Sequence, residues 1–301
     1  MCHLFAMSSG PTPISATFWL LDAADSLDAA PRRSPDGVGL GAIGPDGALR
    51  VLRQTIRGSA DTEVARQPQE ITATTFVAHV RHASTGRASD ENTHPFVRDG
   101  RIFAHNGVIE GLRQLEDELG AAGLEVAGDT DSERYFALIT REIARHDGDV
   151  GAGITSAARW IAANLPMYSI NMILIAGGEL WALRYPDTNG LYVLRRGPGG
   201  RNARHLDHAS PFSEIRVRSV DLLEAPAVVV ESERMDEDPR WRLLDSGELL
   251  HVAADLTMTS ETVLSGPPAH QLTLDELRPQ AAVSQTTAVP EHPVTTASSV
   301  R

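Results

Sequence analysis

The second residue, Cys2, is the only cysteine of the chain, and its thiol is a candidate nucleophile. Removal of Met1 would place this thiol and a free α-amine on the same residue. A thiol titrates at about 8.5 and an α-amine at about 7.7–8.0, so the amine can accept the thiol proton near neutral pH and later protonate a leaving amine. Cys2 therefore has the groups needed for covalent catalysis. The alternative is a small apolar side chain that packs in the interior.

A basic side chain follows an apolar segment in the sequence HVRHASTG (residues 79–86). The guanidinium of Arg81, at the end of a buried strand, can bind a carboxylate through two parallel hydrogen bonds. The alternative for Arg81 is a structural ion pair. Nearby, Pro95 in the sequence ENTHPF indicates a tight loop, in which His94 is better suited to a hydrogen bond of the turn than to a ligand.

Asn106 and Gly107, in the sequence AHNG, have two polar groups that suit an oxyanion. The Asn106 amide can donate a hydrogen bond to a developing negative charge, and Gly107 can offer its backbone N–H with no Cβ in the way. An Asn-Gly pair is also the strongest short signal for a hairpin turn, which is the alternative for these two residues.

An acidic side chain stands at the start of a predicted helix, Asp131 in the sequence GDTDSE (residues 128–133). Its carboxylate can bind the α-ammonium group of an amino acid, and the alternative is an acid that only offsets the helix dipole. With Arg81 on the carboxylate, the two charges would hold both ends of an amino acid.

Hydrophobic patterning predicts the elements that must position these residues. Strands are predicted over Cys2–Ala6 and over Thr74–Val80, the second leading to Arg81, and a further strand over Arg101–His105. The helical spacing of apolar residues predicts a helix over Asp131–Arg145. Each candidate residue thus stands at or near the end of a regular element.

The rest of the chain follows the order strands, helices, strands, which indicates an α+β fold built in layers. A strand over Val38–Ile43 carries Gly39 and Gly41, where a backbone or a ligand is expected to approach closely. Helices are predicted over Ala16–Ala29 and Val150–Leu165, and β-structure follows.

The order Cys2, RHASTG, NTHPF, HNG and GDTDSE resembles the class II glutamine amidotransferase domain, whose members are N-terminal-nucleophile hydrolases. The motifs cover about residues 2–145, and the resemblance extends more faintly to about residue 255. It implies a four-layer αββα sandwich of two antiparallel sheets, which is compatible with the predicted α+β fold.

The resemblance also implies roles for five residues. Cys2 would be the nucleophile and its α-amine the base, and Arg81 would bind the substrate carboxylate. Asn106 and Gly107 would form the oxyanion hole, and Asp131 would bind the substrate α-amino group. The chain begins Cys-His-Leu where synthase members commonly begin Cys-Gly-Ile, and we expect the imidazole of the second of these residues to point into the structure.

Three functions follow from the resemblance. The first is hydrolysis of a γ-glutamyl amide, either glutamine or a larger γ-glutamyl conjugate, through a γ-glutamyl thioester on Cys2. No ammonia-accepting second domain is visible in the sequence, so the chain is similar to short stand-alone members of the family. The alternative is a glutaminase subunit that delivers ammonia to a separate synthase partner. The third is a non-catalytic γ-glutamyl-binding module.

The domain organisation is expected to be a single domain over residues 2–279 and a disordered tail over residues 280–301, because the last segment is rich in Ala, Ser, Thr, Val and Pro without periodicity. The segment MCHLFAMSSG has no basic stretch and no apolar core of signal-peptide length, so a cytoplasmic location is expected.

Charge and composition exclude several classes of protein. The formal net charge of −13, with no basic block, disfavours binding to nucleic acid, and no apolar run has the length of a membrane span. A single cysteine excludes an internal disulfide, and the histidines at 79/82 and 205/208 lack the context of a metal site. We therefore expect no metal, no cofactor, and a small-molecule substrate.

Overall fold

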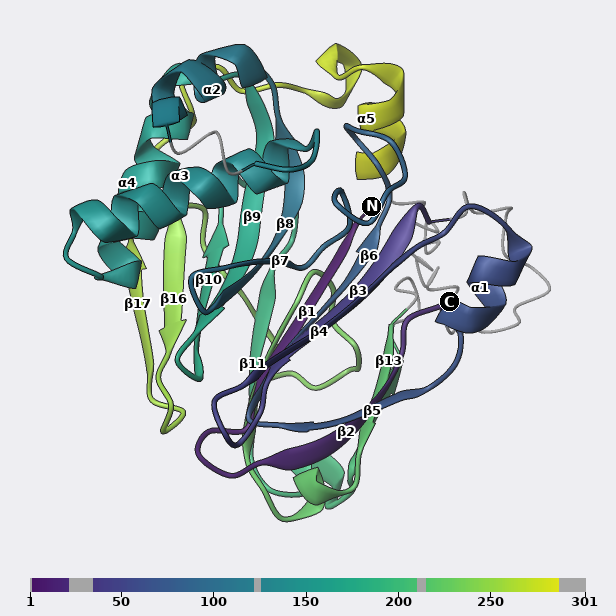
Figure 1. The fold of residues 1–301 in the computed structure, drawn as a ribbon. Helices are drawn as coiled ribbons and strands as arrows, with labels where there is room; N and C mark the ends of the chain where they lie inside the picture. Colours follow the sequence, from purple (N-terminus) through teal and green to yellow (C-terminus); the bar gives the residue numbers. More distant parts are fainter. Residues whose placement is uncertain (1, 22–34, 122–125, 210–214, 287–301) are drawn as a thin grey trace, which may run out of the picture.

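Two antiparallel sheets lie face to face in the computed structural model (Figure 1), which describes residues 2–21, 35–121, 126–209 and 215–286. The first sheet has seven strands, in the order β15 (Arg242–Leu243), β11 (Tyr192–Arg196), β14 (Ala227–Glu231), β1 (His3–Ser8), β6 (Thr75–Arg81), β3 (Gly37–Ile43) and β4 (Leu49–Thr55). The second has six strands, in the order β17 (Met258–Thr262), β16 (Glu248–Val252), β10 (Glu179–Arg184), β9 (Met167–Ala176), β8 (Arg101–Ile109) and β7 (Phe96–Arg98).

Strand β1 lies in the middle of the seven-stranded sheet, and its side chains alternate between two apolar cores. Leu4 and Ala6 enter the core between the two sheets, whereas Phe5 and Met7 enter the core on the other face. Both faces of β1 are therefore buried, which explains why its residues show no polar alternation.

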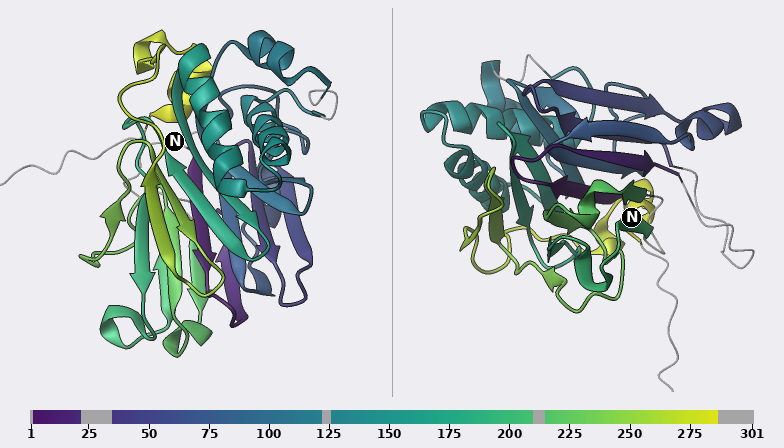
Figure 2. Two further views of the ribbon diagram at one scale, coloured as in Figure 1. Left: turned by 90° about the vertical axis from the view of Figure 1, so that its left-hand side faces the viewer. Right: turned by 90° about the horizontal axis from the view of Figure 1, so that it is seen from below.

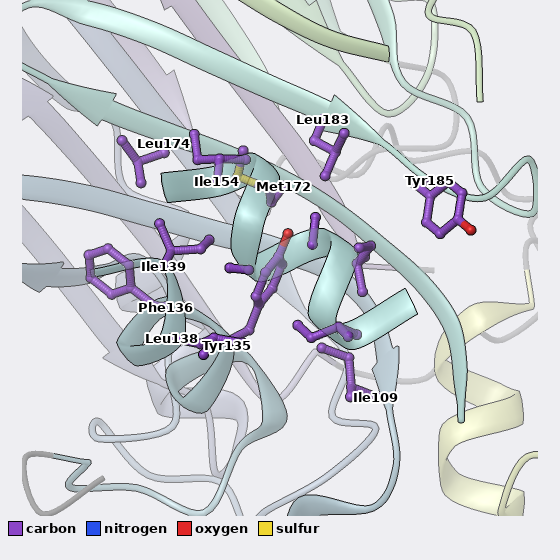
Figure 3. Close-up of a cluster of buried hydrophobic side chains, with 14 of the residues drawn as sticks. Ile109, Tyr135, Phe136, Leu138, Ile139, Ile154, Met172, Leu174, Leu183 and Tyr185 are labelled. Atoms are coloured by element: carbon purple, nitrogen blue, oxygen red, sulfur yellow. The ribbon is translucent and has the colours of Figure 1, made fainter. Parts of the chain in front are cut away.

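Three helices cover the outer face of the six-stranded sheet: α2 (Leu112–Leu119), α3 (Asp131–Arg145) and α4 (Val150–Asn164). Apolar residues of α3 and α4 pack on β8, β9 and β10, as the labelled side chains of Figure 3 show. At the start of α3, the Thr130 side chain caps the helix by accepting a hydrogen bond from the backbone N–H of Glu133.

A small four-stranded sheet covers the outer face of the seven-stranded sheet (Figure 2). Its order is β12 (Leu206–Ala209), β13 (Arg216–Ser219), β2 (Ile14–Trp19) and β5 (Gln69–Ala73). Phe18 of β2 contacts both Phe5 and Phe76, with ring centroids 5.7 Å apart in each pair. The remaining short elements are α1 (Ser59–Ala65), η2 (Gly200–Asn202), η3 (Asp221–Leu223), η4 (Leu274–Glu276) and α5 (Pro279–Gln285).

The predicted α+β fold with two packed antiparallel sheets is confirmed. The layer over the seven-stranded sheet, expected to be helical, is built mainly by the four-stranded sheet. The helix predicted over Ala16–Ala29 is wrong where it can be compared, because β2 occupies its first residues and pairs with β5 and β13. Residues 22–34 of that prediction lie outside the described residues.

The predicted boundary of the C-terminal tail also needs correction. The tail was expected from residue 280, but α5 spans Pro279–Gln285 and its residues Ala281, Ser284 and Gln285 are buried. Residues 287–301 lie outside the described residues. Within the part of the chain that the structure describes, no helix is long and apolar enough to cross a membrane.

Gly39 of β3 allows a loop backbone to lie directly against the sheet, as the sequence predicts, whereas Gly41 is approached by side chains instead. A Cβ at Gly39 would lie 1.9 Å from the carbonyl oxygen of His94, and one at Gly41 would lie 2.9 Å from Ile102. These glycines oppose His79 and Val77 across β6, so the His94 loop covers the face of the sheet that carries His79.

Replacement of Gly39 by alanine should destabilise the fold, because a backbone oxygen cannot move away as a flexible side chain can. We expect Gly39→Ala to lower the free energy of unfolding by about 2–3 kcal/mol, as other overpacking substitutions do. Gly197→Ala is the matched control, since no atom lies within 4 Å of its added Cβ. Equal urea midpoints for the two variants would contradict this account.

Candidate functional site

Cys2 directly precedes β1 and lies at the end of the sandwich where Arg81 ends the neighbouring strand β6. Strand alternation places its side chain on the face of Leu4, toward the six-stranded sheet. The Sγ atom accepts a hydrogen bond from the backbone N–H of His82 at 3.2 Å and lies 3.1 Å from the His82 carbonyl oxygen, to which the thiol donates. The thiol is thus held by the main chain of the residue after Arg81.

Asn106 links the six-stranded sheet to Cys2. It lies within β8, and its Nδ2 donates a hydrogen bond to the carbonyl oxygen of Cys2 at 2.8 Å. The amide is fully buried and has two N–H groups, of which this bond uses one. A second donor of the same amide therefore remains next to the thiol-bearing residue.

Gly107 is a position that no other residue fits. A Cβ there would lie 1.8 Å from the carbonyl oxygen of Ser169 on β9. The hairpin turn weighed for Asn106-Gly107 is not what forms, because both residues lie inside the nine-residue strand β8 and pair with Asn171 and Ile170 of β9.

Arg81 and Asp131 are held on either side of Thr85. The Arg81 guanidinium donates to the Thr85 carbonyl oxygen at 2.8 Å, and the Thr85 hydroxyl donates to Asp131 Oδ1 at 3.1 Å. Both charged residues are buried, with exposed fractions of 3% and 1%. Thr85 lies within RHASTG, but the sequence alone did not single it out; its position inside that motif is the signal that would have identified it.

Asp131 is the first residue of α3 and is tied to the strand that carries Asn106. Its Oδ2 accepts a hydrogen bond from the backbone N–H of Ile109 at 2.8 Å, and its Oδ1 accepts one from Ser132 at 2.9 Å. These bonds fix the carboxylate in one orientation. Oδ1 already accepts from Thr85 and Ser132, whereas Oδ2 accepts from Ile109 alone among the described residues, so Oδ2 retains acceptor capacity for a cation.

The electrostatic surroundings of the Cys2 thiol are mixed. Burial raises its pKa, the hydrogen bond from His82 and the nearby Arg81 charge lower it, and the Asp131 charge raises it. Both charges are therefore close enough to act on the thiol. A buried thiol of raised pKa needs a base beside it to become a nucleophile near neutral pH.

Two buried histidines lie near Arg81: His79, on the same strand β6, and His94, whose ring contacts His79. The rings of His79 and His94 are 4.1 Å apart, and none of their nitrogens is hydrogen bonded to a described residue. Burial lowers the pKa of both well below the usual range, and the Arg81 charge lowers it further, so both rings are neutral. The turn hydrogen bond expected for the His94 ring is not formed with any described residue; the ring lies against His79 at an interplanar angle of 37° instead.

His3 points away from this site, as expected. It lies on the face of β1 opposite Cys2, and its Nε2 contacts the carboxylate of Glu233. The described residues hold no group of three or more His, Cys, Asp or Glu side chains arranged for a metal ion. The described residues of the site bring together a thiol, an amide donor and two opposite charges.

Comparison with known sequences identifies relatives. A family model described as "Glutamine amidotransferases class-II" matches residues 1–272. An uncharacterized protein of Methanocaldococcus jannaschii is 31% identical over 236 residues, which cover 75% of this chain and 64% of that protein. The glutamine–fructose-6-phosphate aminotransferase of Mycolicibacterium paratuberculosis is 35% identical over 147 residues, which cover 46% of this chain and 23% of the aminotransferase. The match thus spans less than two thirds of the first relative and less than a quarter of the second.

A comparison with solved structures bears on the fold. A Pseudomonas aeruginosa protein described as a "predicted glutamine amidotransferase" superposes with a TM-score of 0.64 at 21% identity. The superposition covers 82% of this chain and 96% of the other, so the sandwich is shared over nearly the whole of that protein.

The His79–His94 pair should make the fold sensitive to acid. A histidine whose pKa is lower in the folded than in the unfolded state binds a proton on unfolding, so the stability it contributes is lost as pH falls below about 6.5. Between pH 7.5 and 5.5 we expect a loss of about 1.4 kcal/mol for each of the two histidines.

Urea unfolding at the two pH values measures this effect. His79→Gln and His94→Gln should each remove part of the acid-dependent loss, and His270→Gln, at an exposed position, should not. A stability that falls equally in all variants would assign the acid sensitivity to other groups.

Proposed function

From the premise that this chain belongs to the class II glutamine amidotransferases, we propose that it hydrolyses a γ-glutamyl amide through a thioester on Cys2. The observation that carries the proposal is the 2.8 Å hydrogen bond from Asn106 Nδ2 to the Cys2 carbonyl oxygen. This bond places an amide donor next to Cys2. The oxyanion that forms when the thiol attacks a substrate carbonyl would need a hydrogen-bond donor at this place.

The first half of the reaction forms the thioester. After removal of Met1, the Cys2 α-amine takes the thiol proton and Sγ attacks the γ-carbonyl carbon. The second N–H of the Asn106 amide and the Gly107 N–H stabilise the resulting oxyanion. The C–N bond then breaks, and the α-amine returns its proton to the leaving amine.

The second half regenerates the thiol. A water molecule attacks the γ-glutamyl thioester with the α-amine as base, and a second oxyanion collapses with loss of the Cys2 thiolate. The products are glutamate and the free thiol, so each turnover consumes one amide and one water. No redox step or cofactor is required for this balance.

The two buried charges supply recognition of the glutamyl part. Arg81 would bind the substrate α-carboxylate and Asp131 the α-ammonium, with Thr85 between them fixing their separation. A buried charged pair of this kind rejects ligands that lack one of the two groups, because the partner would be left unpaired.

The leaving amine decides between two forms of this activity. The match to a quarter of the M. paratuberculosis aminotransferase favours glutamine as substrate, with ammonia passed to a separate synthase. The other form is hydrolysis of a larger γ-glutamyl conjugate, in which no synthase takes part. Stimulation of glutamine hydrolysis by a synthase would select the first form, and turnover of a γ-glutamyl conjugate would select the second.

The first prediction concerns Cys2. The purified chain should lack Met1 by intact mass and should release glutamate from L-glutamine or from a γ-glutamyl anilide, a generic conjugate of the same acyl group. Cys2→Ala should lower either release by at least about a thousandfold, because the covalent step is lost. Release that persists in Cys2→Ala, or a processed wild type inactive on both substrates, would contradict the proposal.

The second prediction concerns Asp131. Asp131→Asn keeps the size of the side chain and removes its charge, so the KM for glutamine should rise by about tenfold to a hundredfold. Glutaramate, which is glutamine without its α-amino group, should be a poor substrate of the wild type. Its turnover should fall little further in the variant.

Asp129→Asn is the matched control, because Asp129 is an exposed acid of the same GDTD segment. It should behave as the wild type on both substrates. An Asp131→Asn variant that loses glutamine and glutaramate turnover equally would mean that Asp131 only supports the fold at the start of α3.

A further inference from the structure

Helix α5 (Pro279–Gln285) lies beyond residue 272, where the match to the family model ends. Figures 1 and 2 show it beside the end of the molecule at which β1 begins. A helix of seven residues is not stable by itself, so its position is set by the surface on which it packs. Its residues Ala281, Ser284 and Gln285 are at most 2% exposed, so the helix is firmly docked.

The apolar contacts of this segment are with the strand that carries Asn106. Leu277 and Ala281 form one buried cluster with Val108 of β8 and Tyr168 of β9. Val108 is two residues after Asn106, and strand alternation directs the two side chains to the same face. The C-terminal segment therefore covers β8 immediately beside the proposed oxyanion donor.

A chain of buried amides makes a second link. Gln285 Oε1 accepts a hydrogen bond from Asn189 Nδ2 at 2.8 Å. The backbone carbonyls of Asn189 and Gly190 both accept from Asn171 Nδ2, at 3.2 Å each, and Asn171 Oδ1 accepts from the N–H of Tyr185 at 2.9 Å. Gln285, Asn189 and Asn171 are at most 2% exposed, so water cannot replace a lost partner.

Asn171, at the end of this series of hydrogen-bonded amides, lies directly opposite Asn106. Asn171 and Asn106 are cross-strand partners in β9 and β8, so their side chains project side by side from the same face. Ser169 adds a bond between them, because its hydroxyl donates to the Asn106 carbonyl oxygen at 3.2 Å and accepts from the Asn171 N–H at 3.3 Å. Ser169 thus links the main chain of Asn106 to that of Asn171.

We infer that α5 is part of the active-site framework and that Gln285 is a positioning residue for the Asn106 amide, an inference that rests on the proposed function. Gln285 acts through Asn189 and Asn171 and does not touch the substrate. Because an oxyanion donor must be held to within about 0.5 Å, a loosened Asn106 weakens binding of the transition state. The oxyanion is absent from the ground state, so the effect falls on kcat and not on KM.

Substitution of Gln285 tests this role in the full-length protein. Gln285→Leu removes the acceptor at similar volume, and we expect kcat for glutamate release to fall about tenfold, less than the loss of an oxyanion donor itself, with KM unchanged within about twofold. Gln285→Glu restores an oxygen acceptor and should recover most of kcat. Val283→Ser, at a 54% exposed position of the same helix, is the control.

Asn189→Asp is a second way to break the same contact, because it replaces the Nδ2 donor and leaves the Asn189 backbone carbonyl in place. It should reproduce the fall in kcat even where Gln285→Leu lowers protein yield. A wild-type kcat in folded Gln285→Leu, a parallel rise in KM, or Gln285→Glu as impaired as Gln285→Leu would each overturn the inference.

Hydrogen exchange separates this inference from the proposed function. Amides of residues 102–109 should exchange faster in Gln285→Leu than in the wild type or in Val283→Ser, since the support of β8 is weakened. A wild type that releases no glutamate would contradict the proposed function. The exchange rates would still show whether Gln285 supports strand β8. Equal exchange over residues 102–109 in all three proteins would overturn it.

Discussion

The hydrogen bond between the Asn106 amide and the Cys2 carbonyl oxygen is the contact on which the site depends, because it joins the two sheets of the sandwich at the thiol. β1 brings Cys2 from one sheet and β8 brings Asn106 from the other. The packed apolar core between the sheets holds these strands in register, so the 2.8 Å contact is a property of the whole sandwich.

Main-chain hydrogen bonds at the ends of β6 and β8 hold other parts of the site. The thiol bonds to the backbone of His82, and the Asp131 carboxylate accepts from the Ile109 N–H. Thr85 then ties Asp131 to Arg81. Backbone groups have little freedom once the sheets are formed, so the charges and the thiol are held in place before a substrate arrives.

The buried histidines next to Arg81 carry no charge, although histidine can be charged near neutral pH. His79 and His94 are neutral because burial disfavours their charged forms, and no ring nitrogen of the pair bonds to a described residue. The tight approach of the His94 loop to Gly39 encloses this pair against the sheet. Burial of this pair under the loop is therefore the origin of the acid sensitivity that we expect of the fold.

The sequence by itself determined the residue types of the site and the local signals around them: the motifs from Cys2 to Asp131, the α3 boundaries, and the glycines of β3. Tertiary structure decided what local patterns cannot. β2 is a strand because β5 and β13 pair with it, and its Ile14, Thr17 and Phe18 suit a strand, so the helical spacing from Ala16 onward was misleading here. Thr85 and Gln285 gained their roles from partners that are brought close only when the sheets pack. Local propensity is set by near neighbours in sequence, whereas these contacts join residues far apart in the chain.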